Sequence, residues 1–139
     1  MQYVIAEEAP AGGELVELYD LVGWSAYAND PAKLAAAVGA SFLVLTARDE
    51  QGALVGLIRT VSDGHTIAYL QDILVAPSHQ RQGIGGQLMD DLLERTASIR
   101  QVVLTTDSEE RQRAFYESRG FVEVHDVQPH QLRSFVRLR

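Results

Sequence analysis

The residues with the most evident chemical use lie in one short stretch, 72–86. Three strand-forming residues, Ile73-Leu74-Val75, lead through a loop into a segment that contains Gly83, Gly85 and Gly86. If a helix begins at these glycines, its first amide N–H groups have no partner inside the helix, and the helix dipole adds partial positive charge. A phosphate group can approach a backbone without side chains closely. The stretch therefore predicts a pyrophosphate-binding site; tight packing of a helix on a sheet is the other explanation for the glycines.

Two familiar classes of phosphate-binding loop do not match this stretch. A P-loop ends in Gly-Lys-Ser or Gly-Lys-Thr, and this loop has no such ending. A dinucleotide-binding fingerprint requires a third glycine where this chain has Leu88. Only one strand–helix crossover follows, which is too few for a doubly wound sheet. Arg81 places a positive charge beside the glycines, so an anion remains the expected ligand.

The motif Gln80-x-x-Gly83-x-Gly85, after a strand that ends Ile73-Leu74-Val75-x-Pro77, resembles the acetyl-CoA signature of the GNAT superfamily of N-acetyltransferases. The later run AFYESRGF, residues 114–121, is similar to that family's second hallmark. The resemblance covers essentially the whole chain. It implies one GNAT-like domain over residues 1–139, with an α+β fold: a central mixed, splayed β-sheet flanked by about four helices.

The resemblance also implies roles for particular residues. The loop and first helical turn would bind the CoA pyrophosphate, and the backbone of the preceding strand would pair with the pantetheine arm. The implied cofactor-binding residues are Ile73, Leu74, Val75, Gln80, Arg81, Gln82, Gly83, Ile84, Gly85 and Gly86. Tyr116 resembles the general acid that protonates the departing sulfur; a half-buried core tyrosine is the alternative. Many members carry an asparagine seven residues before this tyrosine, where the chain has Glu109, so no CoA contact is carried over to that position.

Acetyl transfer to an amine requires the neutral amine, which for a pKa of about 10.4 is a very small fraction at pH 7. Asp72 is the carboxylate nearest to the cofactor strand and is the candidate general base. Strand alternation places it on the face opposite Ile73 and Val75, so a structural hydrogen-bond acceptor is the alternative. Arg59 is the one charge in an apolar run, and the facing strand offers Asp72 as its partner; this pairing would leave Asp72 ionised but less free to act as base. Backbone N–H groups at the end of the cofactor strand are the expected oxyanion donors.

The acceptor-binding residues are expected in the first helical region. Trp24 and Tyr27 lie there, with acidic residues nearby in the sequence. Aromatic rings in this position would surround an amine or stack on a ring of the substrate. They would equally serve as core aromatics that anchor the helices, and the sequence leaves both interpretations open.

The elements that must position these residues follow from periodicity and turn signals. Asp30 and Pro31 predict a helix start, and Gly120 a left-handed helix stop with Phe121 folding back. Asp107 is expected to cap the helix that runs to Arg119. The predicted helices are an amphipathic one through Leu15, Leu18, Tyr19 and Val22, then 31–39, 83–98 and 107–119. The predicted strands are 2–7, 41–47, 53–61, 66–75, 101–106, 121–124 and 132–138.

Composition bounds the partners. With no cysteine, disulfides, thiolate metal sites and cysteine nucleophiles are excluded. A net charge of −7 argues against nucleic acid, no apolar run approaches a membrane span, and the N-terminus shows no signal-peptide pattern. No metal is expected, because a strand end and a turn around Pro129 explain the histidines near it. A cytoplasmic protein is expected, and the last strand suggests a possible homodimer.

The leading functional prediction is an acetyl-CoA-dependent N-acetyltransferase that acts on a primary amine of a small molecule or peptide by direct attack on the thioester. The presence of both Tyr116 and the intact glycine loop favours this enzyme. A non-catalytic acyl-CoA-binding sensor or scaffold module is the alternative. A structural or interaction domain whose loop binds nothing is a third possibility.

Overall fold

The computed structural model describes residues 3–139 and divides into two compact units, the first ending at Leu104 and the second beginning at Thr105. The first unit is built on a five-stranded sheet in the order β1-β2-β3-β4-β5. The first four strands pair antiparallel, and β4 and β5 pair parallel. The sheet is therefore mixed, as predicted. Its strands are Val4–Glu7 (β1), Leu43–Arg48 (β2), Leu54–Ser62 (β3), Ile67–Val75 (β4) and Gln101–Val103 (β5).

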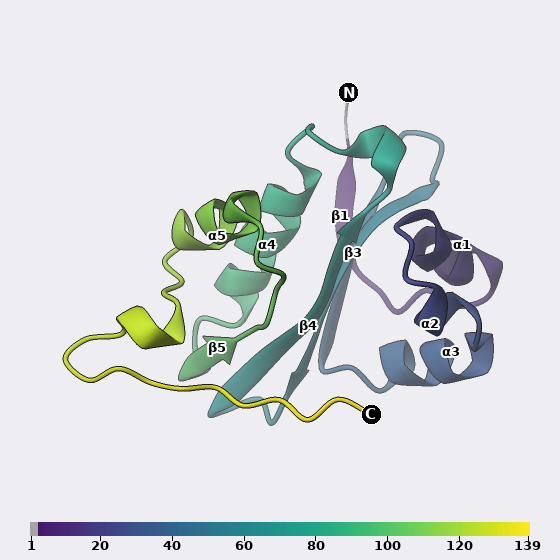
Figure 1. Ribbon diagram of the computed structural model, residues 1–139. Helices are drawn as coiled ribbons and strands as arrows, with labels where there is room; N and C mark the ends of the chain where they lie inside the picture. Colours follow the sequence, from purple (N-terminus) through teal and green to yellow (C-terminus); the bar gives the residue numbers. More distant parts are fainter. Residues whose placement is uncertain (1–2) are drawn as a thin grey trace. The chain divides into compact units, whose positions relative to one another are not determined.

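Helices cover both faces of this sheet (Figure 1). The helices before β2 lie on one face: α1 (Gly13–Leu21), α2 (Ser25–Ala28) and α3 (Pro31–Gly39). The opposite face is covered by α4 (Ile84–Arg95), which directly follows the loop after β4. The predicted start of α3 is confirmed, because the Asp30 carboxylate accepts the backbone N–H of Lys33 and proline occupies the first turn. The one-turn helix α2 was not predicted.

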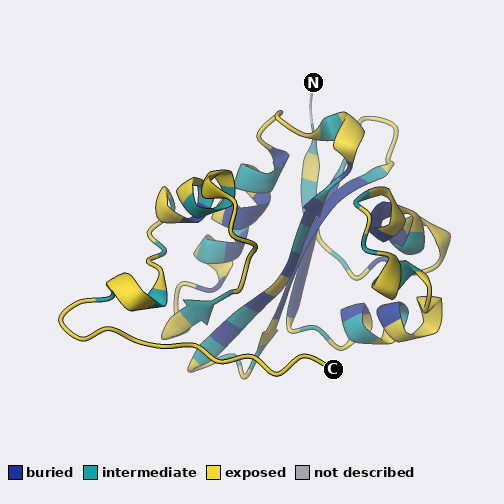
Figure 2. Ribbon diagram, in the orientation of Figure 1, coloured by how far each residue is buried: buried dark blue, intermediate teal, exposed yellow. Residues whose placement is uncertain are grey.

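The core lies between the helices and the sheet; Figure 2 shows buried residues along the central strands and on parts of α1, α3 and α4. The helix predicted over 83–98 is present as α4, and its fully buried side chains, Ile84, Leu88, Met89 and Leu92, form one apolar stripe. The N-terminal half of α4 packs tightly against β3 at Gly56. A methyl group added to Gly56 would lie 3.1 Å from Ile84 and 3.2 Å from Leu88. The absence of a side chain at this position therefore sets how near the start of α4 comes to the sheet.

The sheet is splayed between β4 and β5. These strands pair only from Ile67–Tyr69 to Gln101–Val103. A bulge follows in β4, because Thr60 pairs with Leu70 and Arg59 with Asp72, which leaves Gln71 without a partner in β3. Bulges bend a strand and increase its twist. Beyond Tyr69, the edge of β4 that faces away from β3 has no strand partner in the part of the chain that the structure describes.

The second unit contains the helix α5 (Glu110–Glu117) and a short 3-10 turn, η2 (Val124–Asp126). The predicted stop is confirmed. Gly120 has a φ of 87°, its N–H donates to Glu117, and the N–H of Phe121 donates to the carbonyl of Tyr116. This pair of bonds is a Schellman motif, and the Phe121 ring packs on Tyr116. The predicted Asp107 cap is wrong: Glu109 occupies the N-cap position without a side-chain bond, and Asp107 instead accepts the N–H of Glu109.

The two predicted closing strands, 121–124 and 132–138, are also wrong. Ion pairs from Arg113 to Glu123 and Asp126 hold the first segment as a turn beside α5. The second segment has no regular structure, and Phe135 is 87% exposed. Its alternating pattern is that of a strand, but a strand forms only against a partner. Within this unit the structure describes none.

Candidate active site

The loop between β4 and α4 presents bare backbone amides at the start of the helix. One 3-10 turn, η1 (Pro77–His79), leads into Arg81 and Gly83, which have φ values of 65° and 84°. Gly83 is the N-cap of α4, and no side chain caps the helix. A left-handed residue followed by right-handed ones turns successive N–H groups toward one point, which is an anion-binding arrangement. The predicted helix N-terminus is therefore present, and no side-chain hydrogen bond caps it.

Two glycines at this helix start, Gly83 and Gly85, are not explained by tight internal packing. A methyl group added to Gly83 would have no atom within 4 Å, and one at Gly85 would meet only Val75 at 3.8 Å, an ordinary contact. Gly83 is favoured by its positive φ. Gly85 is favoured by nothing within the fold, although an alanine would stabilise the helix. The packing explanation thus fails at Gly85, and the close approach of an external group remains.

Two side chains fix the loop to the rest of the first unit. The amide nitrogen of Gln80 donates to the carbonyl of Val75 at 3.0 Å, which ties the loop to the end of β4. The His79 ring lies between the Ser78 hydroxyl, 2.8 Å from Nδ1, and the Asp49 carboxylate, 3.8 Å from Nε2. The sequence did not indicate Asp49, because it lies in the β2–β3 turn, thirty residues before His79. The Gln80 side chain therefore serves to hold the loop against the end of β4.

Asp72 belongs to a buried polar network on the α1 side of the sheet. Its Oδ2 accepts a hydrogen bond from Arg59 Nε at 2.6 Å and from the Tyr19 hydroxyl at 2.8 Å. Asp72 is 3% exposed, and Tyr19 is fully buried. Burial, and then the Asp72 charge, raises the pKa of Tyr19, so the phenol keeps its proton and donates. The Arg59 pairing expected from the sequence is confirmed, and this geometry favours the structural alternative for Asp72.

The guanidinium of Arg59 is itself anchored. Burial opposes its charge and is the largest single effect, but the hydrogen bond to Asp72, the Asp72 charge and Tyr19 together outweigh burial, and the pKa of Arg59 is raised above its ordinary value. Its Nη1 also donates to the Ser41 hydroxyl at 3.2 Å, and Ser41 donates to the carbonyl of Ala37 in α3. The network therefore links α1, α3, β3 and β4.

Trp24 and Tyr27 pack with Tyr19 into an aromatic cluster. The ring centroids lie 5.8 Å apart for Tyr19–Trp24, 5.4 Å for Tyr19–Tyr27 and 6.2 Å for Trp24–Tyr27. The Tyr27 hydroxyl accepts a hydrogen bond from the amide of Gln71, the bulge residue of β4, at 3.3 Å. Trp24 and Tyr27 are half-buried. The sequence did not single out Tyr19, because its helical spacing with Leu15 and Leu18 made it appear only as a core residue.

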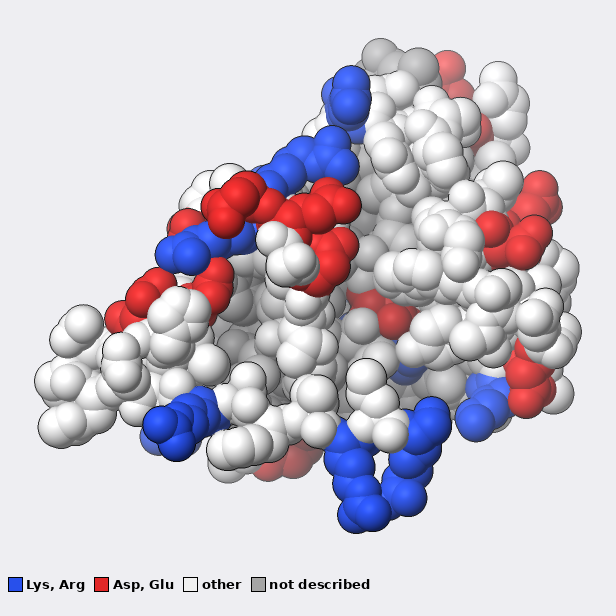
Figure 3. All heavy atoms as spheres, viewed as in Figure 1, with Lys and Arg blue, Asp and Glu red and all other residues white. Residues whose placement is uncertain are grey.

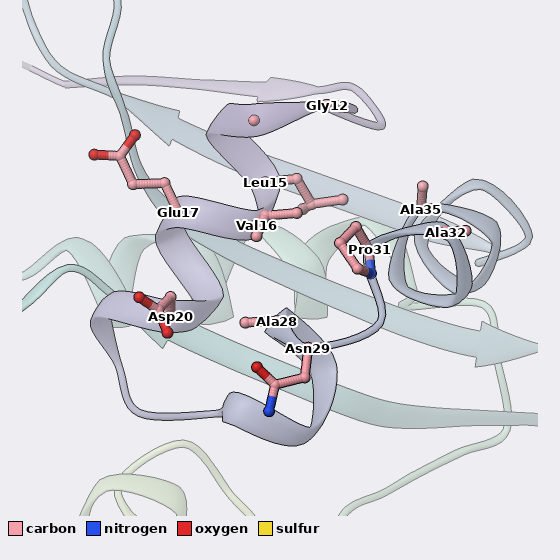
Figure 4. Close-up of a pocket in the computed structure, with 11 residues that line it drawn as sticks. Gly12, Leu15, Val16, Glu17, Asp20, Ala28, Asn29, Pro31, Ala32 and Ala35 are labelled. Atoms are coloured by element: carbon pink, nitrogen blue, oxygen red, sulfur yellow. The ribbon is translucent and has the colours of Figure 1, made fainter.

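A separate open pocket of about 800 Å³ lies between α1 and the α2–α3 segment (Figure 4). Leu15 and Val16 point from α1 toward Pro31, and Glu17 and Asp20 are the acidic residues of its lining. Neither the glycine loop nor the aromatic cluster lines this pocket. This pocket therefore does not coincide with the predicted cofactor or acceptor residues.

Tyr116 lies in the second unit, on α5. It is 7% exposed and packs edge-on between the rings of Phe115 and Phe121, 5.1 and 5.8 Å away. Burial raises its pKa, a hydrogen bond with Thr106 lowers it, and the charge of Asp107 raises it; the net direction is upward. The phenol is therefore protonated at neutral pH, which a proton donor requires.

The remaining surface offers few other candidates. Among residues 3–139, no group of three or more metal-ligating side chains is arranged to hold an ion. Within the same range, no helix has the length and apolar character needed to cross a bilayer. Acidic and basic side chains are interspersed on the face shown in Figure 3, without one continuous basic field.

Comparison with known proteins identifies clear similarities. A model of the acetyltransferase (GNAT) domain matches residues 15–138. Histone acetyltransferase TAP1 of Glycine max is 33% identical over 129 residues, covering 80% of this chain and 54% of that protein. GCN5-related N-acetyltransferase 2, chloroplastic, of Arabidopsis thaliana is 30% identical over 138 residues, covering 80% and 52%. The chain thus spans about half the length of the curated relatives it matches.

Solved structures extend the similarity to the fold. A GNAT family acetyltransferase from Streptococcus pneumoniae TIGR4 has a TM-score of 0.80 and 32% identity, covering 99% of this chain and 100% of that one. An integron cassette protein from V. cholerae has a TM-score of 0.67 at 17% identity, covering 96% and 94%. At that identity the second likeness concerns the fold alone.

Proposed function

The chain belongs to the GNAT family of acetyltransferases, and from this premise we propose that it transfers an acetyl group from acetyl-CoA to a primary amine of a small molecule or peptide. The observation that carries the proposal is the uncapped N-terminus of α4, where Gly85 has no role in internal packing. In this proposal, the amides of residues 83–86 and the positive charge of Arg81 hold the diphosphate of the cofactor. The Gln82 and Ile84 backbone completes this turn.

The strand before the loop supplies the second part of the cofactor site. Ile73, Leu74 and Val75 lie where β4 has no partner on the β5 side among residues 3–139. Their backbone can pair with the amide groups of the pantetheine arm as another strand would. N–H groups of this edge are proposed to stabilise the oxyanion formed when the amine attacks the thioester carbonyl.

Proton transfer is assigned to two different places. The Tyr116 phenol, protonated at neutral pH, gives its proton to the departing thiolate as the carbon–sulfur bond breaks. The amine loses its proton to water. The sequence makes Asp72 the candidate base. Its contacts with Arg59 and Tyr19 instead favour the role of a structural hydrogen-bond acceptor, and we assign it that role.

The acceptor is proposed to bind beside Trp24 and Tyr27, at the β4 bulge where the sheet begins to splay. The similarity to a histone acetyltransferase is a reason to include lysine peptides among the amines tested, beside small amines. The acceptor class is otherwise kept at primary amines.

The proposal is tested by cofactor binding in a pair of matched variants. Gly85→Ala places a methyl group where the diphosphate would lie, and Gly13→Ala places one in the first turn of α1, also in open space. Both changes favour the helix, by about 1 kcal/mol each, so both variants are expected to be as stable as the parent or more so. Calorimetry with CoA is expected to show weaker binding for Gly85→Ala alone. Equal affinity in all three proteins would contradict the phosphate site.

Turnover separates the enzyme from a non-catalytic acyl-CoA-binding module. A panel of amines is incubated with acetyl-CoA, and free thiol is measured. Thiol release that depends on an amine supports the enzyme, whereas CoA binding without thiol release on any amine supports the module. Absence of any stabilisation by CoA would favour a structural domain, because a ligand at 100 times its dissociation constant adds about 2.7 kcal/mol to stability.

We also propose that the chain forms a homodimer through its last segment. Phe135, Val136 and Leu138 are 87%, 67% and 88% exposed, and the segment has the alternation of a strand without being one. Pairing with a second copy would bury these side chains and satisfy the backbone.

A further inference from the structure

Two adjacent residues of β4 form hydrogen bonds with tyrosines of α1 and α2. Gln71 donates to the Tyr27 hydroxyl at 3.3 Å, and Asp72 accepts from the Tyr19 hydroxyl at 2.8 Å. In a regular strand successive side chains point to opposite faces, so two neighbours would not reach the same helical segment. The bulge at Gln71 interrupts this alternation. The bulge therefore gives the sheet two bonds to the aromatic cluster.

Tyr19 connects the buried charge pair to Trp24 in two ways. Its carbonyl accepts the backbone N–H of Trp24 at 3.1 Å, in the turn that Gly23 closes with a φ of 83°. Its ring lies 5.8 Å from that of Trp24 and 5.4 Å from that of Tyr27. The hydroxyl is bound to Asp72, whose position is fixed in turn by Arg59. Movement of Tyr19 would therefore move both half-buried aromatic residues.

We propose that Tyr19 is a positioning residue, which holds Trp24 and Tyr27 on the β4 bulge so that the acceptor amine can bind there. The acceptor part of this inference rests on the proposed acetyl transfer; the coupling of Tyr19 to Trp24 does not. The network lies on the α1 face of the sheet, and the glycine loop leads into α4 on the other (Figure 1). Loss of the Tyr19 hydroxyl therefore affects the acceptor and leaves CoA binding unchanged.

The test uses Tyr19→Phe, which keeps the ring and removes only the hydroxyl. Trp24 is the single tryptophan of the chain, so acrylamide quenching of its fluorescence reports on this segment directly. The quenching constant is expected to rise in the variant. With the best amine of a panel of 2-phenylethylamine, putrescine, spermidine and a lysine peptide, KM for the amine is expected to rise about tenfold, the value of a hydrogen bond to a charged group. The kcat and the CoA dissociation constant are expected to stay close to those of the parent.

Thr60→Val is the matched control. It removes another fully buried hydroxyl, whose oxygen has no hydrogen-bond partner within the described chain, from the residue next to Arg59. It is expected to leave both quenching and the amine KM unchanged. If Tyr19→Phe does not fold, Gln71→Met replaces it; this exposed change removes the bond to Tyr27 and is expected to raise quenching and KM by a smaller factor.

Each outcome decides the proposal. A folded Tyr19→Phe with unchanged quenching and unchanged amine KM overturns it, as does a loss of CoA affinity equal to the loss for the amine. Where Gln71→Met is the variant used, unchanged quenching and KM overturn it as well. If the parent protein binds CoA but uses no amine, or binds no CoA, the proposed function fails. In that event the quenching constants alone support or overturn the coupling of Tyr19 to Trp24.

Discussion

Tyr116 combines burial with an upward-shifted pKa, so its phenol carries the proton that the proposed transfer to the departing thiolate requires. Tyr116→Phe keeps the ring contacts with Phe115 and Phe121 and removes the proton. Turnover is expected to fall by about tenfold or more, with little change in CoA affinity. Steady-state rates and calorimetry on the same preparation measure the two effects. An unchanged rate would remove Tyr116 from the mechanism.

Arg59 and Asp72 form a buried charge pair in the first unit. Removal of one partner from a buried pair is expected to cost more unfolding free energy than removal of one partner from a surface pair. Arg59→Met leaves the Asp72 carboxylate buried with Tyr19 as its remaining side-chain donor among residues 3–139, so a loss of about 3–5 kcal/mol in unfolding free energy is expected. The double variant Arg59→Met/Asp72→Leu removes both charges and is expected to recover most of that loss. Urea unfolding of both variants and the parent provides the comparison. A double variant no more stable than the single one would mean that the charge is not what matters.

At the scale of elements, the β3–β4 turn depends on one ionised side chain. The Thr66 hydroxyl and the backbone N–H groups of His65 and Thr66 bind the Asp63 carboxylate and hold its pKa well below its usual range. Its contribution to stability is therefore complete above the unfolded-state pKa of about 3.9 and is lost as the pH falls through the folded-state value.

The direction of this pKa shift predicts how the unfolding free energy of the parent compares with that of Asp63→Asn as the pH changes. The parent is expected to be the more stable at neutral pH, and the difference is expected to shrink below about pH 4. Glu8 and Glu14, whose pKa values Arg48 lowers, are present in both proteins and cancel in the comparison. Urea unfolding of both proteins at several pH values between neutral and acidic measures this difference in unfolding free energy. A difference independent of pH would show that the charge of Asp63 does not support the turn.

The sequence predicted those elements whose signals are local. The strand–loop–helix around the glycines follows from the spacing of Gly83 and Gly85 and from the apolar stripe of α4. The buried network did not follow in full, because Tyr19 and Asp72 are 53 residues apart and meet only through a bulge that no local pattern announces. The closing strands were wrong for a related reason, since alternation along 132–138 indicates a strand only when a neighbour is available.

At the scale of the whole molecule, the last segment carries the two most exposed large apolar side chains that the structure describes. Phe135 and Leu138 are its most exposed apolar side chains, and Arg133, Arg137 and Arg139 give it positive charge in an acidic chain. Light scattering is expected to show a particle with twice the mass of one chain. Phe135→Ser combined with Leu138→Ser is expected to yield the single-chain mass with unchanged helix content by circular dichroism. A single-chain mass for the parent would refute the dimer.

The close packing at Gly56 bears on how the affinity of such a protein for its cofactor can change. The start of α4 packs on this residue through Ile84 and Leu88, so the position of the helix end relative to the sheet is governed from within the core. A substitution there would shift the amides proposed to hold the diphosphate without altering any residue of the loop. Affinity for the cofactor can in this way be adjusted by remote sequence variation, while the binding loop itself stays the same.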